Sequence, residues 1–337
     1  MSEPFVLAVD GGNSKTDLAL VRVDGELLAL ARGDMSSPHH LGLEGALAAL
    51  EGLRQRALGE AGVDGRAAVA QLLLAGVDFP AEEERARAAI AVRGWADETH
   101  VGNDTFAVLR AGTERGWGVA VVCGAGINCV GVSPDGRHAR FPALGAITGD
   151  WGGGYDLGLA AVSAAARSED GRGPRTSLEQ AVPAHFGLRT PLELAEAIHA
   201  GRLQMRRVIE LAPLVFAEAG QDSVAAEILD RLAAEVVALV RAALTRLDLR
   251  DQPVEILLGG GVLRSADGRL VDAIEAGLRD VAPRAIVHRT ESPPIVGAAL
   301  LALDAVGADA AAQQRARDEL GAAVGRLEER YEPVEVE

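Results

Sequence analysis

The chain has 337 residues, which is long enough for two domains. It carries 33 basic and 49 acidic residues, so its formal net charge at pH 7 is −16. This acidic balance argues against nucleic acid or an anionic membrane as the main partner, and it fits a small polyanion such as a nucleotide better. Aromatic residues make up only 3% of the chain, so the core must be built from Ala, Leu and Val.

The cysteines and the first residues suggest where the protein resides. Cys123 and Cys129 are too few for a disulfide framework, and their spacing is not typical of a zinc site. We therefore expect them to be small buried hydrophobic side chains. The first strand is predicted to begin by Phe5 without a preceding basic and apolar run, so a secretory signal is not expected. A cytoplasmic location without a membrane partner follows by elimination.

The first hundred residues alternate strands and helices. Asp24-Gly25 is a strong hairpin signal between two of the predicted strands. Leucines at helical spacing then predict a helix, and further apolar and amphipathic segments follow it. In chain order the predicted elements are strands 5–10, 16–23 and 26–33, helix 43–61, strand 68–77, helix 81–93 and a short strand 98–104.

Residues 117–141 repeat the organisation of the first thirty residues. Both segments have the pattern of an apolar strand, a glycine turn, a second strand, a tight turn and a third strand. They lie roughly 110 residues apart, which indicates a duplicated domain. Because each copy continues into helices and further strands, the sequence predicts an α/β protein with mixed sheets.

A long helical stretch follows, and the chain then returns to a sheet. Residues 154–248 are almost all helical by pattern, with predicted breaks at Pro174, Pro183, Pro191 and Gly201. The remaining predictions are a strand from residue 254, helix 268–280, strand 283–289, helix 293–306 and a last helix whose acidic end, 332–337, is expected to fray.

Three glycine-rich turns, at residues 11–12, 124–126 and 259–261, each follow an apolar strand. A single turn of this kind is explained by hairpin geometry alone, because tight turns need the positive φ that glycine allows. Glycine also permits close approach of a ligand to the backbone, and successive N–H groups then form an anion site. Three such turns, two of them within a repeat, indicate a polyphosphate site.

Lys15 is the only lysine in the chain and lies in the first glycine turn. Chance in an arginine-rich sequence is one explanation. The other is a need for a compact ammonium group, which the planar guanidinium of arginine replaces poorly.

Several motifs together carry a resemblance to a known family. They are LAVDGGNSKTDLALV, GNDT, VVCGAGINCVGV, TGDWGGGYDLG and ILLGGGVLRS, in this order. The chain resembles the sugar-kinase, heat-shock and actin ATPase superfamily over residues 5 to about 305. Within it, the chain is most similar to the N-acetylglucosamine kinase group of the BadF/BadG/BcrA/BcrD ATPase family.

The resemblance implies an α/β fold of two ribonuclease-H-like (actin-like ATPase) domains with mixed sheets around a cleft. The first domain would comprise residues 1–113 and 294–337, with the C-terminal helix packing back on it. The second would comprise residues 114–293, with a helical insertion at about 155–250.

The resemblance also implies ATP and Mg²⁺ as cofactors. Asp10 would hold Mg²⁺ through water. Lys15 would contact the β- and γ-phosphates from the first turn. The residues implied in nucleotide binding are Gly11, Gly12, Asn13, Lys15 and Thr16 in the first turn, Gly124, Gly126 and Asn128 in the second, and Gly259, Gly260 and Gly261 beside the adenosine.

The second turn departs from the family pattern, which usually reads Gly-Thr-Gly-Ser. Ala125 and Ile127 replace the two hydroxyl side chains. Backbone N–H donors survive this change, so we expect the turn to hold phosphate through its backbone.

The sugar site is implied by the Asn103-Asp104 pair and by two further segments. Asp104 would accept the proton of the attacking sugar hydroxyl, although an N-cap role is the alternative. Asn103 and Asp150 would bind sugar hydroxyls, and Asp150 could instead be a turn aspartate. Ser37 and His39 are the candidate sugar contacts in a loop where family members carry an Asn.

Two neighbouring features carry weaker functional interpretations. Trp151 could pack on a sugar face or in the core. His39 and His40 are adjacent and lack further clustered ligands, so we do not expect them to bind a metal.

The leading hypothesis is ATP-dependent phosphorylation of a small-molecule sugar, N-acetylglucosamine first, to its 6-phosphate by a homodimeric enzyme. One alternative is an ATPase that activates a 2-hydroxyacyl-CoA dehydratase-type partner through an iron–sulfur cluster shared across a dimer. The close spacing of Cys123 and Cys129 does not suit that cluster. The other alternative is a non-catalytic actin-like regulator that binds sugar or nucleotide.

Overall fold

The computed structural model describes residues 3–266 and 268–331. Its contacts divide the chain into two compact units. The first comprises the described residues up to Trp117 together with those from Thr290 onward, and the second runs from Gly118 to Arg289. Each division lies four residues from the boundary expected from the sequence, since we predicted 113/114 and 293/294 and the structure divides at 117/118 and 289/290.

The described part of the first unit contains a five-stranded mixed sheet in the order β3-β2-β1-β4-β5. β1, β2 and β3 pair antiparallel, whereas β4 and β5 join β1 in parallel. Parallel pairs need crossover connections, and the helices α1 and α2 provide them. The strands are β1 (Phe5–Gly11), β2 (Lys15–Arg22), β3 (Leu27–Asp34), β4 (Ala67–Leu74) and β5 (Ala96–Gly102).

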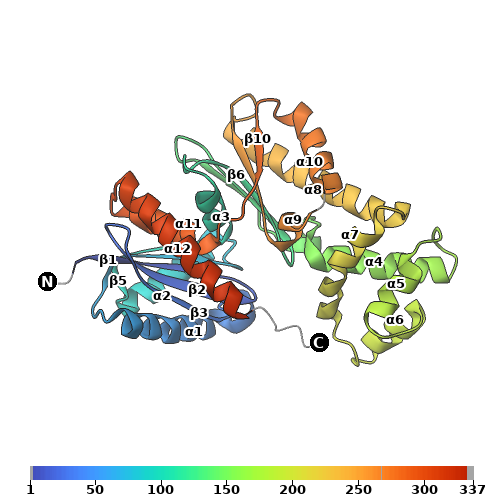
Figure 1. Cartoon of the computed structure of the whole chain (residues 1–337), viewed down its shortest axis with the longest axis horizontal. Coiled ribbons are helices and arrows are strands. Elements are labelled where there is room, and N and C mark those ends of the chain that lie inside the picture. The colour runs from blue at the N-terminus through green and yellow to red at the C-terminus, as the bar shows by residue number, and fades with distance from the viewer. Residues whose placement is uncertain (1–2, 267, 332–337) are drawn as a thin grey trace. The chain divides into compact units, whose positions relative to one another are not determined.

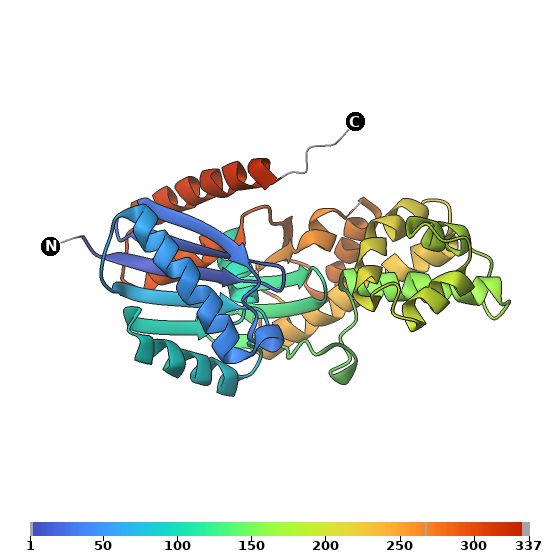
Figure 2. The same cartoon turned by 90° about the horizontal axis from the view of Figure 1, so that it is seen from below.

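Helices cover both faces of this sheet (Figures 1 and 2). α1 (Pro38–Ala61) and α2 (Pro80–Arg93) pack on one face. α3 (Thr105–Gly112), α11 (Pro294–Ala305) and α12 (Ala310–Tyr331) pack on the other. Burial on both faces explains why the first strand is continuously apolar rather than alternating with polar residues.

The two faces of β1 divide by the period of two that a strand imposes. Leu7 and Val9 belong to the core beside α1, whereas Val6 and Ala8 belong to the core beside α11. Asp10 continues the second of these faces. Its carboxyl group is therefore directed to the side where α3 begins and α12 ends, which determines the composition of the site described below.

The second unit repeats the first. Its sheet, in the described residues, has the order β10-β9-β6-β7-β8, with β6, β7 and β8 antiparallel and β9 and β10 parallel to β6. This is the same pattern of pairing, and it confirms the duplication and the α/β class predicted from the sequence. The strands are β6 (Gly118–Cys123), β7 (Ile127–Val132), β8 (His138–Arg140), β9 (Glu255–Gly259) and β10 (Ile286–Arg289).

A helical insertion separates β8 from β9. It contains α4 (Gly153–Glu169), α5 (Leu178–His185), α6 (Pro191–His199), α7 (Ala212–Glu218) and α8 (Ser223–Leu247), with short 3₁₀ turns η1 (Gly145–Ile147) and η2 (Met205–Leu211). α9 (Gly261–Arg264) and α10 (Gly268–Val281) follow β9. α8 packs along β6, β7 and β8 and carries the longest buried apolar stripe of the insertion.

The predicted helix breaks are correct except at Pro183. Pro191 starts α6, and Gly201 follows that helix with φ of +69°. Pro183, however, lies inside α5, as the sixth residue of that helix. The helix is so short that proline removes only a bond near its end, where the fixed φ of proline is still helical. The acidic segment 332–337 lies outside the described residues. In the part of the chain that the structure describes, no helix combines the length and apolarity needed to cross a membrane.

Candidate active site

Two acidic residues face each other where β1 ends and β2 begins, next to the first glycine turn. Asp10 of β1 pairs directly with Asp17 of β2, and Asp17 pairs with Arg32 of β3. The guanidinium of Arg32 donates to both Asp17 oxygens, at 2.6 and 2.8 Å, and Asp17 is only 3% exposed. Like charges directly opposite on a sheet destabilise it, and the ion pair of Arg32 with Asp17 offsets part of this repulsion. Asp17 and Arg32 were not among the predicted site residues, although the register of the predicted hairpin places Asp17 opposite Asp10.

Asp10 is a half-buried carboxylate with an altered pKa. Burial raises the pKa of Asp10 to about 8, and the nearby charges of Asp104 and Asp17 add to the rise, whereas Lys15 and Arg32 oppose it. A divalent cation would relieve this repulsion, and carboxylate oxygens are the ligands that Mg²⁺ prefers. Among the described residues, no group of three or more His, Cys, Asp or Glu side chains could hold a metal by itself. A cation at Asp10 would therefore need further ligands besides these side chains.

The first glycine turn is shaped by close contacts. A Cβ atom on Gly11 would lie 2.5 Å from Leu74 and 2.6 Å from Ser36. A Cβ atom on Gly12 would lie 2.9 Å from the carbonyl oxygen of Lys15, to which the Gly12 N–H donates. A side chain at Gly12 would therefore displace backbone, whereas one at Gly11 would have to displace the side-chain ends of Leu74 and Ser36. The tip that follows is exposed, and it comprises Asn13, Ser14 and Lys15.

Thr16 lies on the inner side of this turn rather than on its surface. It is 1% exposed, and its hydroxyl donates to the Ser36 hydroxyl at 2.8 Å. We expected Thr16 to close the turn around phosphate. The structure instead directs its side chain into unit one, where it fixes the turn from beneath.

Lys15 contacts the C-terminal helix. Its Nζ lies 3.4 Å from Oε1 of Glu328 in α12, and the two side chains are 50% and 60% exposed. An exposed ion pair of this kind contributes little to stability, because solvent screens it. The ammonium group is therefore available to a competing anion.

Asp104 lies between β5 and the start of α3. It occupies the N-cap position, but in the described structure its side chain accepts no capping hydrogen bond. The neighbouring Asn103 takes that role, since its Oδ1 accepts from the N–H and hydroxyl of Thr105 at 3.0 and 2.6 Å. Asp104 is half-buried. Burial raises the pKa of Asp104 to about 6, and the charge of Asp78 adds to the rise, whereas the N–H groups of Asp104 and Thr105 oppose it.

Asn103 is 3% exposed and engaged at both ends of its amide. Its Nδ2 donates to Oδ1 of Asp78 at 2.8 Å and to the Val77 carbonyl at 3.4 Å. We expected Asn103 to bind the sugar directly. In the structure it links the loop after β4 to the first turn of α3, and Asp104 lies between these two attachments.

The loop that contains Ser37 and His39 packs against the turn after β4. A Cβ atom on Gly76 would lie 2.7 Å from the His39 Cβ atom and 3.0 Å from the Ser37 hydroxyl, and Gly76 has φ of +77°. Ser37 is fully buried, and among the described residues its hydroxyl has no hydrogen-bond partner. His39 is exposed. The first unit thus gathers Ser37, Asp78 and Asp104 around segments that meet at one end of its sheet.

The second glycine turn, in the second unit, rests on α4. The carbonyls of Gly124 and Ala125 accept from the N–H groups of Gly154 and Tyr155 at 2.8 and 3.0 Å. A Cβ atom on Gly153 would lie 2.5 Å from the Ala125 carbonyl oxygen. The turn's carbonyls are therefore directed at the helix, while Ala125 and Gly126 remain exposed.

The third glycine turn lies beside the second. Gly260 has φ of +85°, and a Cβ atom there would lie 2.4 Å from the Cys123 carbonyl oxygen. Gly259 ends β9 opposite Val122, and Gly261 is exposed at the start of α9. The structure thus brings together two of the turns that the sequence analysis assigned to ATP.

Other predicted residues of the second unit have local partners. Asn128 accepts from the Cys129 N–H at 2.7 Å, and Asp150 accepts from the Gly145 N–H at 2.6 Å, as a turn aspartate does. The guanidinium of Arg231 lies 3.9 Å from the Trp151 ring centroid, so a cation covers one face of that ring.

Both cysteines are buried, as predicted. Burial raises the pKa of the Cys123 thiol to about 12 and raises that of Cys129 further. Inert buried thiols are poor candidates for cluster ligands.

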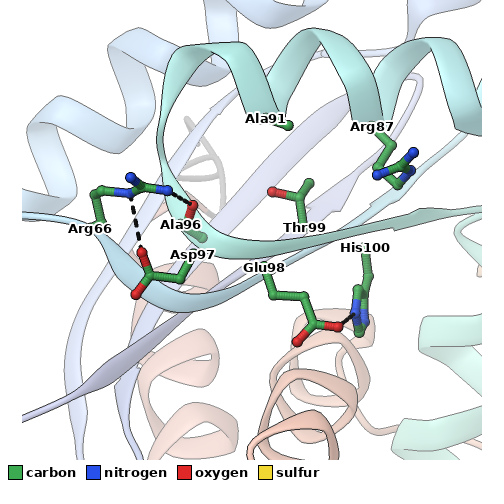
Figure 3. A pocket seen from close by; sticks show the side chains of 8 residues that line it. All are labelled: Arg66, Arg87, Ala91, Ala96, Asp97, Glu98, Thr99 and His100. Atoms are coloured by element: carbon green, nitrogen blue, oxygen red, sulfur yellow. Dashed lines mark hydrogen bonds and ion pairs between the residues drawn. The ribbon is translucent and has the colours of Figure 1, made fainter.

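A separate surface pocket of about 400 Å³ lies between α2 and β5 (Figure 3). Two pairs of its side chains contact each other: Arg66 lies 3.4 Å from Asp97, and Glu98 lies 2.7 Å from His100. Arg87 pairs instead with Glu84, outside the pocket lining. The residues that line it do not include any of the predicted site residues. The predicted site residues of each unit therefore lie outside this pocket.

The duplicated sheets, with glycine turns after corresponding strands, define an ATPase of the actin and sugar-kinase fold class. The chain belongs to the BadF/BadG/BcrA/BcrD ATPase family, whose model matches residues 7–302. α12 begins after this matched range.

Curated relatives and solved structures agree with this assignment. The chain is 28% identical to an N-acetylmuramic acid/N-acetylglucosamine kinase of Clostridium acetobutylicum, over 88% of this chain and 98% of that protein. It is also 28% identical to an N-acetyl-D-glucosamine kinase of Dictyostelium discoideum, over 90% and 99%. A Chromobacterium violaceum structure provisionally named an N-acetylglucosamine kinase matches with a TM-score of 0.71 and 26% identity, over 89% of this chain and 99% of that chain. A ROK hexokinase from Thermus thermophilus shares the fold, with a TM-score of 0.55 and 19% identity over 89% and 99%.

Proposed function

We propose that the protein transfers the γ-phosphoryl group of ATP to a hydroxyl of an N-acetylated amino sugar, with N-acetylglucosamine as the first candidate and its 6-phosphate as the product. The observation that carries this proposal is Asp104, a half-buried carboxylate at a strand end that the fold does not use for capping. A general base works best when its pKa lies near the working pH, and the pKa of Asp104, at about 6, meets that condition. The names of the two curated relatives support the sugar.

Enzymes catalyse phosphoryl transfer by positioning the reactants and stabilising charge rather than by covalent catalysis, and each candidate residue has one of these roles. Asp104 accepts the proton of the sugar hydroxyl as that oxygen attacks phosphorus. Lys15 supplies a compact positive charge to the transferring phosphate. Asp10 would hold Mg²⁺ through water, and the bound ion would neutralise developing charge on the phosphate oxygens. The N–H groups of Gly12 and Gly124 bond within their own turns, so the other exposed N–H groups of the glycine turns would contact the remaining phosphates.

The sugar is proposed to bind beside Ser37 and Asp104. The Ser37 hydroxyl is costly while it remains unsatisfied, and because it is fully buried, a sugar hydroxyl would reach it only after the surrounding loop shifts. His39 and Asp150 are retained as further candidate sugar contacts. A homodimer, a cytoplasmic location and the absence of nucleic-acid or membrane partners belong to the same proposal and rest on the family resemblance and the acidic composition.

A substrate screen tests the function directly. ADP release with Mg-ATP is measured for N-acetylglucosamine, N-acetylmuramic acid, glucosamine and glucose. NMR of the product then identifies the carbon that carries the new phosphate. We expect the N-acetylated sugars to give the highest kcat/KM. ADP release at the same rate without any sugar would favour the ATPase-activator alternative, which the buried cysteines oppose. An iron assay of anaerobically purified protein then separates the two.

Lys15 variants should affect nucleotide more than sugar. We expect Lys15→Ala to lose most of the activity, chiefly through a higher KM for ATP, because it removes the charge. Lys15→Arg should keep part of the activity, because the larger planar head misplaces the contact. Neither should change the Tm without ligand, since the ammonium group is exposed. A change confined to the sugar KM would contradict the assignment.

Removing the partner of Lys15 should change the KM for ATP in the opposite direction, to a lower value. Glu328 competes with phosphate for the ammonium group, so Glu328→Gln should lower the KM for ATP by about 2–5-fold, as expected for an exposed pair. The matched control is Glu329→Gln, which removes the same charge from the next, exposed residue of α12. Equal effects of the two variants would mean that general charge, rather than the contact with Lys15, is responsible.

A further inference from the structure

The loop between β4 and α2 contains a carboxylate that the phosphoryl-transfer scheme does not use. Asp78 is partly buried in this loop, next to Val77, which is 1% exposed. The backbone N–H groups of Asp78 and Phe79 donate to Oε2 of Glu82 at 2.9 and 3.1 Å. This capping arrangement at the start of α2 fixes the loop's backbone, so the carboxyl group of Asp78 projects from a defined position.

Asp78 is connected to the segment that carries Asp104. Its Oδ1 accepts from the amide of Asn103 at 2.8 Å, and the oxygen of the same amide accepts from the N–H and hydroxyl of Thr105. The residues on both sides of Asp104 are therefore tied into one hydrogen-bond network. Because Asn103 is 3% exposed, water competes little for these bonds.

The charges around Asp104 come from two elements. Asp78 faces it from the loop after β4, and Asp10 faces it from the end of β1. The N–H groups of Asp104 and Thr105, at the start of α3, act in the opposite direction. After burial, the negative charge of Asp78 is the main cause that raises the pKa of Asp104.

We propose that Asp78 is a positioning residue for the catalytic base, holding Asp104 through the Asn103 amide and keeping a second negative charge beside it. This inference rests on the proposed function, because it assumes that Asp104 is the base. Two contributions follow, one geometric and one electrostatic, and different substitutions separate them.

Asp78→Asn is the substitution that separates charge from geometry. Asparagine keeps an oxygen that can accept from Asn103, but it removes the charge. We expect kcat at pH 8 to stay within about threefold of the value for the unsubstituted enzyme. The acidic limb of the plot of kcat against pH should shift to lower pH by about half a unit or more, because the pKa of Asp104 falls when a neighbouring negative charge is removed. Asp78→Ala also removes the hydrogen bond and should lower kcat at pH 8 by about tenfold. The matched control, Asp97→Asn, removes one charge from an exposed position of the same unit and should leave the profile unchanged.

The measurement is kcat against pH from 5 to 8.5 with saturating Mg-ATP and sugar, accompanied by thermal melts. An acidic limb that stays in place in Asp78→Asn, while Asp104→Asn remains inactive, would overturn the positioning role and leave the proposed function standing. Full activity of Asp104→Asn would overturn both. If Asp78→Ala does not fold, Asp78→Ser replaces it as the variant that tests the hydrogen bond to Asn103. A kcat of that variant equal to the kcat of Asp78→Asn would show that this hydrogen bond does not position Asp104.

Discussion

Replacing Asp104 by asparagine should lower kcat by about 10²–10⁴-fold, the range for loss of a general base. Asparagine has nearly the same shape, and in the described structure the Asp104 side chain makes no capping bond that the fold would lose. The melting temperature and the dissociation constant for the sugar should therefore change little. Steady-state kinetics, calorimetric sugar binding and a thermal melt check the three parts of this expectation.

The pH dependence of the unsubstituted enzyme provides an independent check on Asp104. The base must be ionised to accept a proton, and the pKa of Asp104 lies at about 6, above its ordinary value of 3.8. Activity should therefore be full above this pKa and fall as the pH decreases through it. Activity that persists undiminished to pH 4.5 would contradict the assignment.

Replacing Asp10 by asparagine should abolish most activity and yet stabilise the protein without ligand at alkaline pH. The loss of a carboxylate that holds Mg²⁺ through water should lower kcat by about 10²-fold or more and raise the Mg²⁺ concentration needed for half-maximal rate. The stability effect has a separate cause. Because the pKa of Asp10 is raised to about 8 in the folded protein, ionising it opposes folding.

The sign of this stability effect depends on pH. A carboxyl whose folded pKa is raised supports the folded state fully below its unfolded pKa near 3.8, and this support is lost as the pH rises toward 8. The stability of Asp10→Asn relative to the unsubstituted protein should therefore increase as the pH rises from 5 to 8. We expect a Tm advantage of at least about 2 °C at pH 8. A lower Tm for the variant at pH 8 would show that Asp10 makes stabilising contacts that outweigh its desolvation.

Local signals were enough to predict most strands and helices. The first hairpin was predicted because Asp24-Gly25 and two apolar runs determine it over a few residues. The repeat could be predicted because the same local pattern recurs in one chain. Pro183 was misjudged because the cost of a proline depends on how close it lies to the helix end, and the sequence gives that position poorly.

The arrangement of the candidate site residues depends on tertiary contacts, which determine the role of each of two adjacent residues. Asn103 and Asp104 are both good N-cap residues, and the pattern alone could not tell which would cap α3 and which would remain available. Tertiary contacts with Asp78, 25 residues earlier, decide this in favour of Asn103. Thr16 likewise depends on a partner from another segment, Ser36. Candidate residues could thus be proposed from the sequence, whereas the direction of their side chains and partners such as Asp17, Arg32 and Asp78 could not.

The duplication of the sheet has preserved backbone structure without preserving charge. In the first unit, the pair before the end of the hairpin ladder is Asp10 opposite Asp17. In the second unit, the corresponding pair is Val122 opposite Asn128. Both ladders lead into a glycine turn, yet this ladder pair consists of two carboxylates in the first unit and of an apolar and an amide side chain in the second. The two halves have therefore diverged in charge at this pair. A carboxylate pair that needs a neighbouring cation in the first unit has an apolar and an amide counterpart in the second, so the corresponding positions tolerate different substitutions.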